Sequence, residues 1–153
     1  MGKVEAIWIK VDEDGAAPLR QSEITLVADK GVVGDRHFGN RKQRQVLLVD
    51  TGCLKELGLS AGDLREQITV DFKGLQQLPS GTELNVGEAT IRITGDCAPC
   101  RSMARYLGED PQSFVNRAMR KRGMLGVVSR EGLVREGDSV TAKEPPPQDD
   151  TLD

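Results

Sequence analysis

Short apolar runs recur along this chain, and several of them alternate apolar with polar residues. Alternation with a period of two indicates β-strands, whereas an amphipathic helix repeats its apolar positions every three to four residues. We therefore predict strands at residues 4–9, 23–27, 45–49, 68–70, 83–86, 89–94, 126–128 and 139–142. The chain contains 17 glycines, and many of them fall in the turns between these runs. This pattern favours a mainly β (α+β) fold, as a barrel or a sandwich, over a doubly wound sheet.

A short helix is predicted over residues 51–57, between two of the predicted strands. Asp50 or Thr51 is a suitable N-cap, because its side-chain oxygen accepts a hydrogen bond from the free N–H groups of the first turn. Gly58 would end the helix, since glycine adopts the left-handed backbone conformation that often follows a last turn.

One long helical stretch is predicted after the strand at 89–94, from residue 101 to about residue 122. Gly108 would split this stretch into two helices. Asp110 followed by Pro111 is the typical start of a new helix, with an N-cap and a proline at the first helical position.

The length of 153 residues fits a single domain with a substantial core. We predict that residues 1–143 form this domain. Residues 144–153 contain three consecutive prolines and then mostly acidic and polar residues, which bury little apolar surface. We predict that they form a disordered tail.

Composition and charge exclude several classes of function. The formal net charge of -3 gives no reason to expect nucleic acid as a partner. No apolar run approaches the ~20 residues that a membrane-spanning helix requires, and residues 1–10 carry no stretch of the signal-peptide kind. Three cysteines, an odd number, fit a reducing compartment better than a disulfide framework. We therefore expect a cytoplasmic protein that binds neither nucleic acid nor a membrane.

The most informative motif is Cys97-Ala98-Pro99-Cys100, followed directly by Arg101. It lies where a predicted strand gives way to a predicted helix. A sulfur at a helix start faces unpaired backbone N–H groups, and Arg101 adds a fixed positive charge, so both favour thiolate over thiol. Such a cysteine is suited to act as a nucleophile or as a ligand for a soft metal.

Other interpretations of Cys97 and Cys100 stay open at this point. A structural zinc site needs four ligands, and only Cys53 and the single His37 remain as further candidates. Dithiol redox chemistry and simple burial in the core are the other two alternatives. Cys53 itself lies beside Leu54 in the predicted helix, which favours core packing for this third cysteine.

A second cluster, residues 31–39, has glycines at both ends and Asp35, Arg36 and His37 between them. Glycines let a backbone approach a ligand closely, and the three side chains supply a carboxylate, a cation and an imidazole. Three further cations follow within residues 41–44. The alternative is a solvated loop, and the glycine spacing is not that of a phosphate-binding P-loop.

A third cluster begins at Arg122-Gly123 and continues to Gly137-Asp138. Arg122 is a candidate anion ligand, because the guanidinium group suits oxyanions. Gly137-Asp138 is more typical of a turn before the last strand.

Taken in order, the clusters resemble the MOSC domain, which is named for the C-terminal domain of molybdenum-cofactor sulfurases. The resemblance covers about residues 4–142 and rests on Gly34-Asp35-Arg36-His37 with Gly39, Arg44-Gln45-Val46, Pro99-Cys100, Arg122-Gly123 and Gly137-Asp138-Ser139-Val140. The order and spacing of these motifs are more specific than any one of them. The chain departs from many members at Arg65-Glu66-Gln67, where they have Gly-Glu-Asn.

The resemblance implies a MOSC-like β-barrel of short strands with a few helices, and a site for the molybdopterin form of the molybdenum cofactor. It also implies that Cys100, which matches the family's characteristic cysteine, is the catalytic residue and either carries sulfur or ligates molybdenum. Molybdenum accepts soft thiolate ligands, which agrees with this role. The cofactor is anionic, and we expect the residues that bind it to be Gly34, Asp35, Arg36, His37, Arg44, Arg101 and Arg122.

Three functions remain open on this evidence. The first is a small molybdenum-dependent oxidoreductase that reduces N-hydroxylated compounds, as some family members do. The second is a carrier that holds the cofactor, or a persulfide on Cys100, for delivery elsewhere. The first requires an electron-transfer protein as partner, and the second a sulfur donor. The third is a metal-free thiol-redox protein that uses Cys97 and Cys100.

Overall fold

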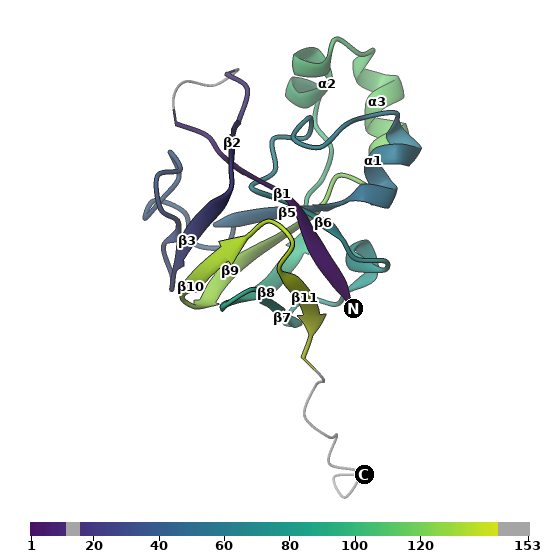
Figure 1. The fold of residues 1–153 in the computed structure, drawn as a ribbon. Coiled ribbons are helices and arrows are strands. Elements are labelled where there is room, and N and C mark those ends of the chain that lie inside the picture. Colours follow the sequence, from purple (N-terminus) through teal and green to yellow (C-terminus); the bar gives the residue numbers. More distant parts are fainter. Residues whose placement is uncertain (12–15, 144–153) are drawn as a thin grey trace, which may run out of the picture.

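A closed β-barrel forms the centre of the molecule (Figure 1). The computed structural model describes residues 1–11 and 16–143. The barrel strands are β1 (Gly2–Ile9), β5 (Val46–Asp50), β6 (Ile68–Asp71), β7 (Glu83–Val86), β8 (Ala89–Asp96), β9 (Met124–Arg130) and β11 (Ser139–Ala142). They pair in the order β11-β7-β8-β9-β5-β6-β1, and an antiparallel pairing of β1 with β11 closes the ring. The predicted mainly β fold and barrel are therefore confirmed.

The barrel contains one parallel pair among the described strands, β5 and β6. Parallel neighbours need a crossover connection, and here it contains the short helix α1 (Thr51–Leu57). Asp50 caps this helix through a hydrogen bond from the Gly52 N–H, and Gly58 ends it at φ +70°. Both capping predictions are confirmed.

Sequence patterns missed four short elements. β2 (Leu19–Gln21) extends the barrel sheet beside β1, and β4 (Gly31–Val32) and β10 (Gly132–Arg135) flank β3 (Glu23–Val27) in a separate sheet of order β10-β3-β4. The fourth is a single 3₁₀ turn, η1 (Leu75–Gln77). Segments of two to four residues are too short to display a periodicity, so their pairing is decided by tertiary contacts.

The predicted long helical stretch is two short helices, α2 (Arg101–Leu107) and α3 (Pro111–Ala118). Gly108 ends α2 at φ +73°, and Asp110 caps α3 by accepting a hydrogen bond from the Ser113 N–H. The helix stops at residue 118 instead of near residue 122, because the backbone turns extended at Met119 and left-handed at Arg120.

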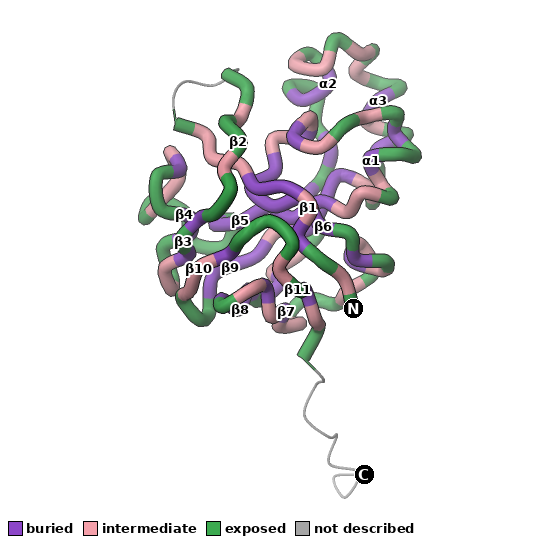
Figure 2. Tube along the Cα trace, viewed as in Figure 1, coloured by how far each residue is buried: buried purple, intermediate pink, exposed green. Residues whose placement is uncertain are grey.

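Two apolar clusters stabilise the fold, and both are visible as buried segments in Figure 2. Alternate strand residues such as Val46 and Leu48 fill the barrel. Leu47 and Val49, on the opposite face of β5, pack with the helices, where Phe114 of α3 is fully buried. The helices thus cover one outer side of the barrel, as Figure 1 shows.

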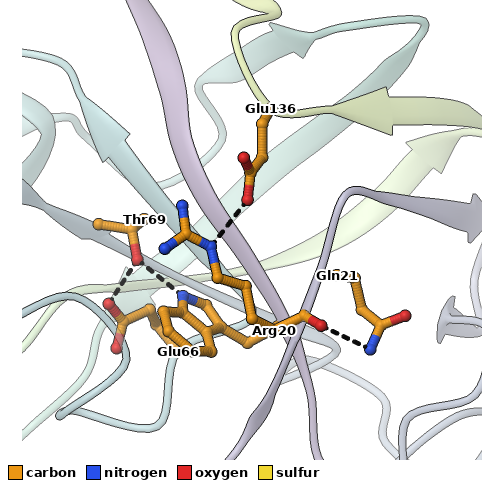
Figure 3. Close-up of polar contacts among 6 residues, drawn as sticks. Arg20, Gln21, Glu66, Thr69 and Glu136 are labelled. Carbon is orange, nitrogen blue, oxygen red and sulfur yellow. Dashed lines mark hydrogen bonds and ion pairs between the residues drawn. The ribbon is translucent and has the colours of Figure 1, made fainter.

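A polar network on the outside of the barrel fixes the segment that precedes β6 (Figure 3). The indole N–H of Trp8 donates to the Thr69 hydroxyl oxygen (3.1 Å), and that hydroxyl donates to the fully buried carboxylate of Glu66 (2.6 Å). The Gly62 N–H donates to the same carboxylate oxygen (2.9 Å). Gly62 also lies against Trp8, and a Cβ there would come within 2.9 Å of the indole. Arg20 covers the other side of the ring, 5.7 Å from its centroid, and pairs with Glu136.

Two further predictions concern membrane-spanning segments and the C-terminal tail. No helix within residues 1–11 and 16–143 is both long and apolar enough to cross a membrane. The predicted disordered tail, residues 144–153, lies outside the described residues, so that prediction and the domain boundary at residue 143 stay predictions.

Candidate functional site

A cavity of about 580 Å³ opens on the outside of the barrel, between elements that are far apart in sequence. It is lined by the end of β1, the segment before β5, the segment before β6, α2 and the start of β9. Its charged lining consists of Lys10, His37, Arg41, Arg44, Arg65 and Arg122. No carboxylate of the described residues lines it. The cavity is therefore suited to an anion.

Arg122 is the most informative of these side chains. It is only 8% exposed, and its Nε and Nη1 atoms have no hydrogen-bond partner among the described residues. Buried polar groups are nearly always paired, and an unpaired buried charge is strongly unfavourable. A ligand with oxyanion groups would supply the missing acceptors.

A compact hydrogen-bond node fixes the backbone beside Arg122. The side-chain amide of Gln76 accepts from the Gly123 N–H (3.1 Å) and donates to the Gly123 carbonyl (3.0 Å) and to Asp96. The Cys97 N–H donates to the same carbonyl (2.9 Å). Gly123 has a φ of +116°, and a Cβ there would lie 2.6 Å from the Leu48 carbonyl oxygen. The node therefore holds Arg122 and the cysteine segment in a fixed relation.

Both cysteines of the motif line the cavity. Cys100 is exposed and is the N-cap of α2, where its Sγ accepts a hydrogen bond from the Met103 N–H (3.4 Å). Cys97 is buried, and both thiols are free. The segment between them contains no hydrogen-bonded turn or sharp bend.

The loop before β5 is held by two buried polar side chains. The Asp35 carboxylate accepts hydrogen bonds from the backbone N–H groups of Lys10 (2.8 Å) and His37 (3.1 Å). The Gln45 amide accepts from the Val128 N–H (2.9 Å) and donates to the Arg41 carbonyl (3.4 Å). Asp35 and Gln45 thus shape the loop that presents the cations.

The structure brings four of the predicted site residues to the cavity: His37, Arg44, Cys100 and Arg122. The other four are not among its lining residues: Gly34, Asp35, Arg36 and Arg101. Arg101 is exposed at the first position of α2, whereas Ser102 and Tyr106 of the same helix line the cavity. Arg36 instead ties the loop to β1, since its backbone N–H donates to the Lys10 carbonyl (2.6 Å).

Sequence patterns missed Lys10, Arg65, Gln67 and Tyr106 as lining residues. Lys10 follows β1, Arg65 and Gln67 precede β6, and Tyr106 lies on α2, so all four lie away from the glycine-rich motifs. Gln67 accepts a hydrogen bond from the Leu47 N–H (2.8 Å) and is 3% exposed, so its polar group serves the strand pairing beside the cavity. The one available signal was the departure at Arg65-Glu66-Gln67 from the family pattern.

Burial, together with the clustered charges, shifts the protonation equilibria of Lys10 and His37. Burial lowers the pKa of Lys10 below its usual 10.5, the nearby Asp35 opposes this, and the charges of Arg65 and Arg122 add to the lowering. Burial likewise lowers the pKa of His37 below 6.5, and Lys10 and Arg41 lower it further. The neutral form of His37 is therefore favoured in the free site, and an anion would raise both pKa values.

Cys53 lies elsewhere. It is half-buried and lines a second cavity, of about 640 Å³, instead of packing in the core as predicted. Burial raises the pKa of its thiol, as do Asp50 and Glu56. Within the described residues no three His, Cys, Asp or Glu side chains group together as metal ligands. The zinc alternative, which required Cys53 and His37 to join the other two cysteines, is therefore unsupported.

Comparison with known proteins agrees with this architecture. No curated protein is significantly similar to the chain in sequence. Among solved structures, the YuaD protein from Bacillus subtilis superposes with a TM-score of 0.77 at 20% identity, covering 91% of this chain and 93% of that one. YiiM from Escherichia coli superposes with a TM-score of 0.69 at 16% identity, covering 95% and 72%. YiiM from Geobacillus stearothermophilus gives 0.69 at 14% identity, covering 94% and 76%.

These likenesses show the fold alone, since all three identities are low. The sequence comparison is more specific, because the MOSC domain profile matches residues 33–141. That range includes the loop before β5, the cysteine motif and Arg122. This chain belongs to the MOSC domain family.

Proposed function

We propose that this chain binds the molybdopterin form of the molybdenum cofactor in the cation-lined cavity, with Cys100 as the sulfur that meets the metal. The observation that supports this most directly is Arg122, a buried guanidinium at the cavity wall whose Nε and Nη1 atoms lack a partner in the part of the chain that the structure describes.

The donor set fits such a group. Guanidinium groups bind phosphate oxygens with two parallel hydrogen bonds, and the lining offers three further arginines in Arg41, Arg44 and Arg65. The exposed thiol of Cys100 is a soft ligand, which suits molybdenum. Apolar side chains complete the wall: Leu47, Met103 and Leu125. When bound, the cofactor would supply a redox-active metal.

Each nearby residue has a separate task in this proposal. Arg122 compensates the anionic charge from a buried position. The protonated forms of Lys10 and His37 become more favourable as the anion enters, because a negative charge beside them raises their lowered pKa values. Gln67 and Asp35 keep the strand ends in place and do not contribute charge to the ligand.

Two activities are compatible with this binding function. In one, the chain is a small reductase of N-hydroxylated compounds, supplied with electrons by a partner protein. In the other, Cys100 carries a persulfide received from a sulfur donor, for delivery with the cofactor. A cyanide-releasable sulfur on the cofactor-free protein supports the carrier. Reduction of an N-hydroxylated compound by the loaded protein supports the reductase.

The test is metal and pterin analysis of protein purified from cells that make the cofactor. We expect molybdenum and pterin to co-purify with the wild type and to be largely lost from Arg122→Met, which keeps the volume and removes the charge. Arg105→Ala, an exposed change on α2 that removes a charge away from the lining, is the matched control. A wild type without molybdenum or pterin, whose thiol activity requires Cys97 and Cys100 equally, would favour the thiol-redox alternative.

A further inference from the structure

Arg65 has an unusual backbone conformation. Its φ is +60°, in the left-handed region that glycine enters freely and that side chains with a Cβ adopt at a cost. Within residues 1–11 and 16–143 the only other non-glycine residues there are Asp29 and Arg120. A long, charged side chain at a position suited to glycine calls for an explanation.

The surrounding contacts force this conformation on residue 65. The Arg65 N–H donates to the Gly62 carbonyl (2.9 Å), and the Gly62 N–H donates to the buried Glu66 carboxylate (2.9 Å). Glu66 is in turn fixed by Thr69, as Figure 3 shows. The turn from 62 to 66 is closed from both ends, and strained backbone persists where the surroundings over-determine it in this way.

The Arg65 side chain lines the cavity and contacts two other parts of the chain. Its guanidinium lies over the ring of Tyr106 in α2, with Cζ 5.0 Å from the ring centroid. One terminal nitrogen donates to the Ala16 carbonyl, in the segment before β2. Arg65 therefore connects three separate parts of the chain while lining the cavity.

The position is electrostatically unfavourable without a ligand. The charge of Arg65 acts on Lys10, and the buried Arg122 lines the same cavity. Arg65 makes one side-chain hydrogen bond within the described residues, to Ala16, although a guanidinium carries five N–H donors. Its remaining N–H donors have no hydrogen-bond partner within the described residues and are available to oxyanion groups of a ligand in the cavity.

We propose that Arg65 slows the release of the ligand and selects for its chemistry. Its guanidinium, held by contacts with Tyr106 and Ala16, binds an oxyanion group of the ligand at the cavity. We call this role of Arg65 the latch. This inference rests on the proposed anion-binding function of the cavity and adds a residue that sets how slowly the ligand leaves. Ligands that end in a phosphate or another planar-edged oxyanion are favoured, because they match the two parallel donors of the fork.

The experiment compares three variants for pyrophosphate binding and thermal unfolding at one pH. Arg65→Gly removes the latch and the strain together. Arg65→Lys keeps the charge but loses the fork. Arg120→Gly relieves the same left-handed strain (φ +61°) outside this cavity and is the matched control. Trp8 is the chain's single tryptophan and packs on Gly62, so its fluorescence can follow binding and release in stopped flow.

We expect Arg65→Gly to bind pyrophosphate at least tenfold more weakly, mainly through faster release, with no fall in melting temperature. Arg65→Lys should show a smaller loss of affinity in the same direction. Arg120→Gly should keep wild-type affinity while melting at the same or a higher temperature.

The outcomes distinguish the anion-binding function of the cavity from the latch role of Arg65. A wild type that binds pyrophosphate, together with Arg65→Gly and Arg65→Lys that release it as slowly, overturns the latch alone. A wild type that does not bind pyrophosphate overturns the anion function and the latch with it. If Arg65→Gly does not fold, an Arg65→Lys variant with unchanged affinity and release overturns the latch.

Discussion

Gln76 offers the sharpest test of how the site is held together, because one amide bonds both backbone polar groups of Gly123, the Asp96 carboxylate and the Met124 sulfur. It accepts from the Gly123 N–H and donates to the Gly123 carbonyl and to Asp96. It lies in η1, between β6 and β7, and is not among the residues that line the cavity. Replacing it with alanine removes these bonds without changing a residue of the cation-lined cavity, although Gln76 itself lines the second cavity, beside Cys53.

The size of the effect follows from what is left behind. Gly123 is buried, so its N–H would lose its partner without gaining water. Leaving a buried donor unsatisfied costs about 1–3 kcal/mol of unfolding free energy. For a chain of this size each kcal/mol shifts the melting temperature by about 2–4 °C, so we expect Gln76→Ala to melt roughly 2–12 °C lower.

A second effect separates a positioning role from plain stability. Gly123 adjoins Arg122 and bonds Cys97, so a loosened Gly123 should let the buried guanidinium move. We expect Gln76→Ala to bind pyrophosphate more weakly even well below its melting temperature. The adjacent exposed residue supplies the control: Gln77→Ala should change stability by less than about 0.5 kcal/mol.

Two results would refute this reasoning. If Gln76→Ala melts within about one degree of the wild type, the hydrogen bonds of the Gln76 amide do not stabilise the backbone at Gly123. If it melts lower but binds pyrophosphate with wild-type affinity throughout, Gln76 stabilises the fold without positioning Arg122. Calorimetric titration and thermal unfolding of the same preparations distinguish these cases.

Three further predictions concern the thiols and His37. In single-cysteine variants, alkylation at pH 7 should be fastest at the exposed Cys100, slower at Cys53, whose raised pKa leaves little thiolate, and slowest at the buried Cys97; faster reaction at Cys97 or Cys53 contradicts this order. Cys100→Ser should abolish molybdenum-dependent activity while Cys97→Ser only weakens it, and equal complete loss would indicate dithiol chemistry. Sulfate affinity should rise as the pH falls from the pKa of His37 in the complex toward its lower pKa in the free site, below 6.5. His37→Gln should flatten that dependence, and an unchanged pH profile would exclude His37 as its source.

Much of the fold was predictable because its elements carry local signals. β5 is a nearly continuous apolar run, because one face of the strand packs in the barrel core and the other packs against the helices. Gly58, Gly108 and Asp110 mark helix ends whatever the tertiary context. The turn prediction at Gly137-Asp138 holds for the same local reason, with the Asp138 carboxylate accepting from the Arg135 N–H (2.7 Å).

The site was only partly predictable, because its side chains are assembled by barrel closure. Lys10 directly follows β1 and Arg65 lies in the turn before β6, and the pairing of β1 with β6 brings these two segments together; nothing local marks either residue as a ligand. Asp35 resembles a ligand in the sequence, yet its carboxylate is consumed by two backbone N–H groups. Arg101 adjoins the key cysteine, but the first turn of α2 leaves it exposed and away from the cavity lining.

The charge distribution links binding to stability. The chain has a formal net charge of -3, yet Lys10, Arg65 and Arg122 meet at one cavity. Asp35 partly compensates Lys10, but burial and the other cations still lower the pKa of that lysine. The cations therefore destabilise the free site. An anion would reduce their mutual repulsion and would supply acceptors for the Nε and Nη1 donors of Arg122, which have no partner among the described residues.

A ligand present at 100 times its Kd would add about 2.7 kcal/mol to the free energy of unfolding. In Arg122→Met the free protein should be at least as stable as the wild type, but most of this ligand-dependent gain should disappear. A gain that survives the substitution would mean that the anion binds without the buried guanidinium.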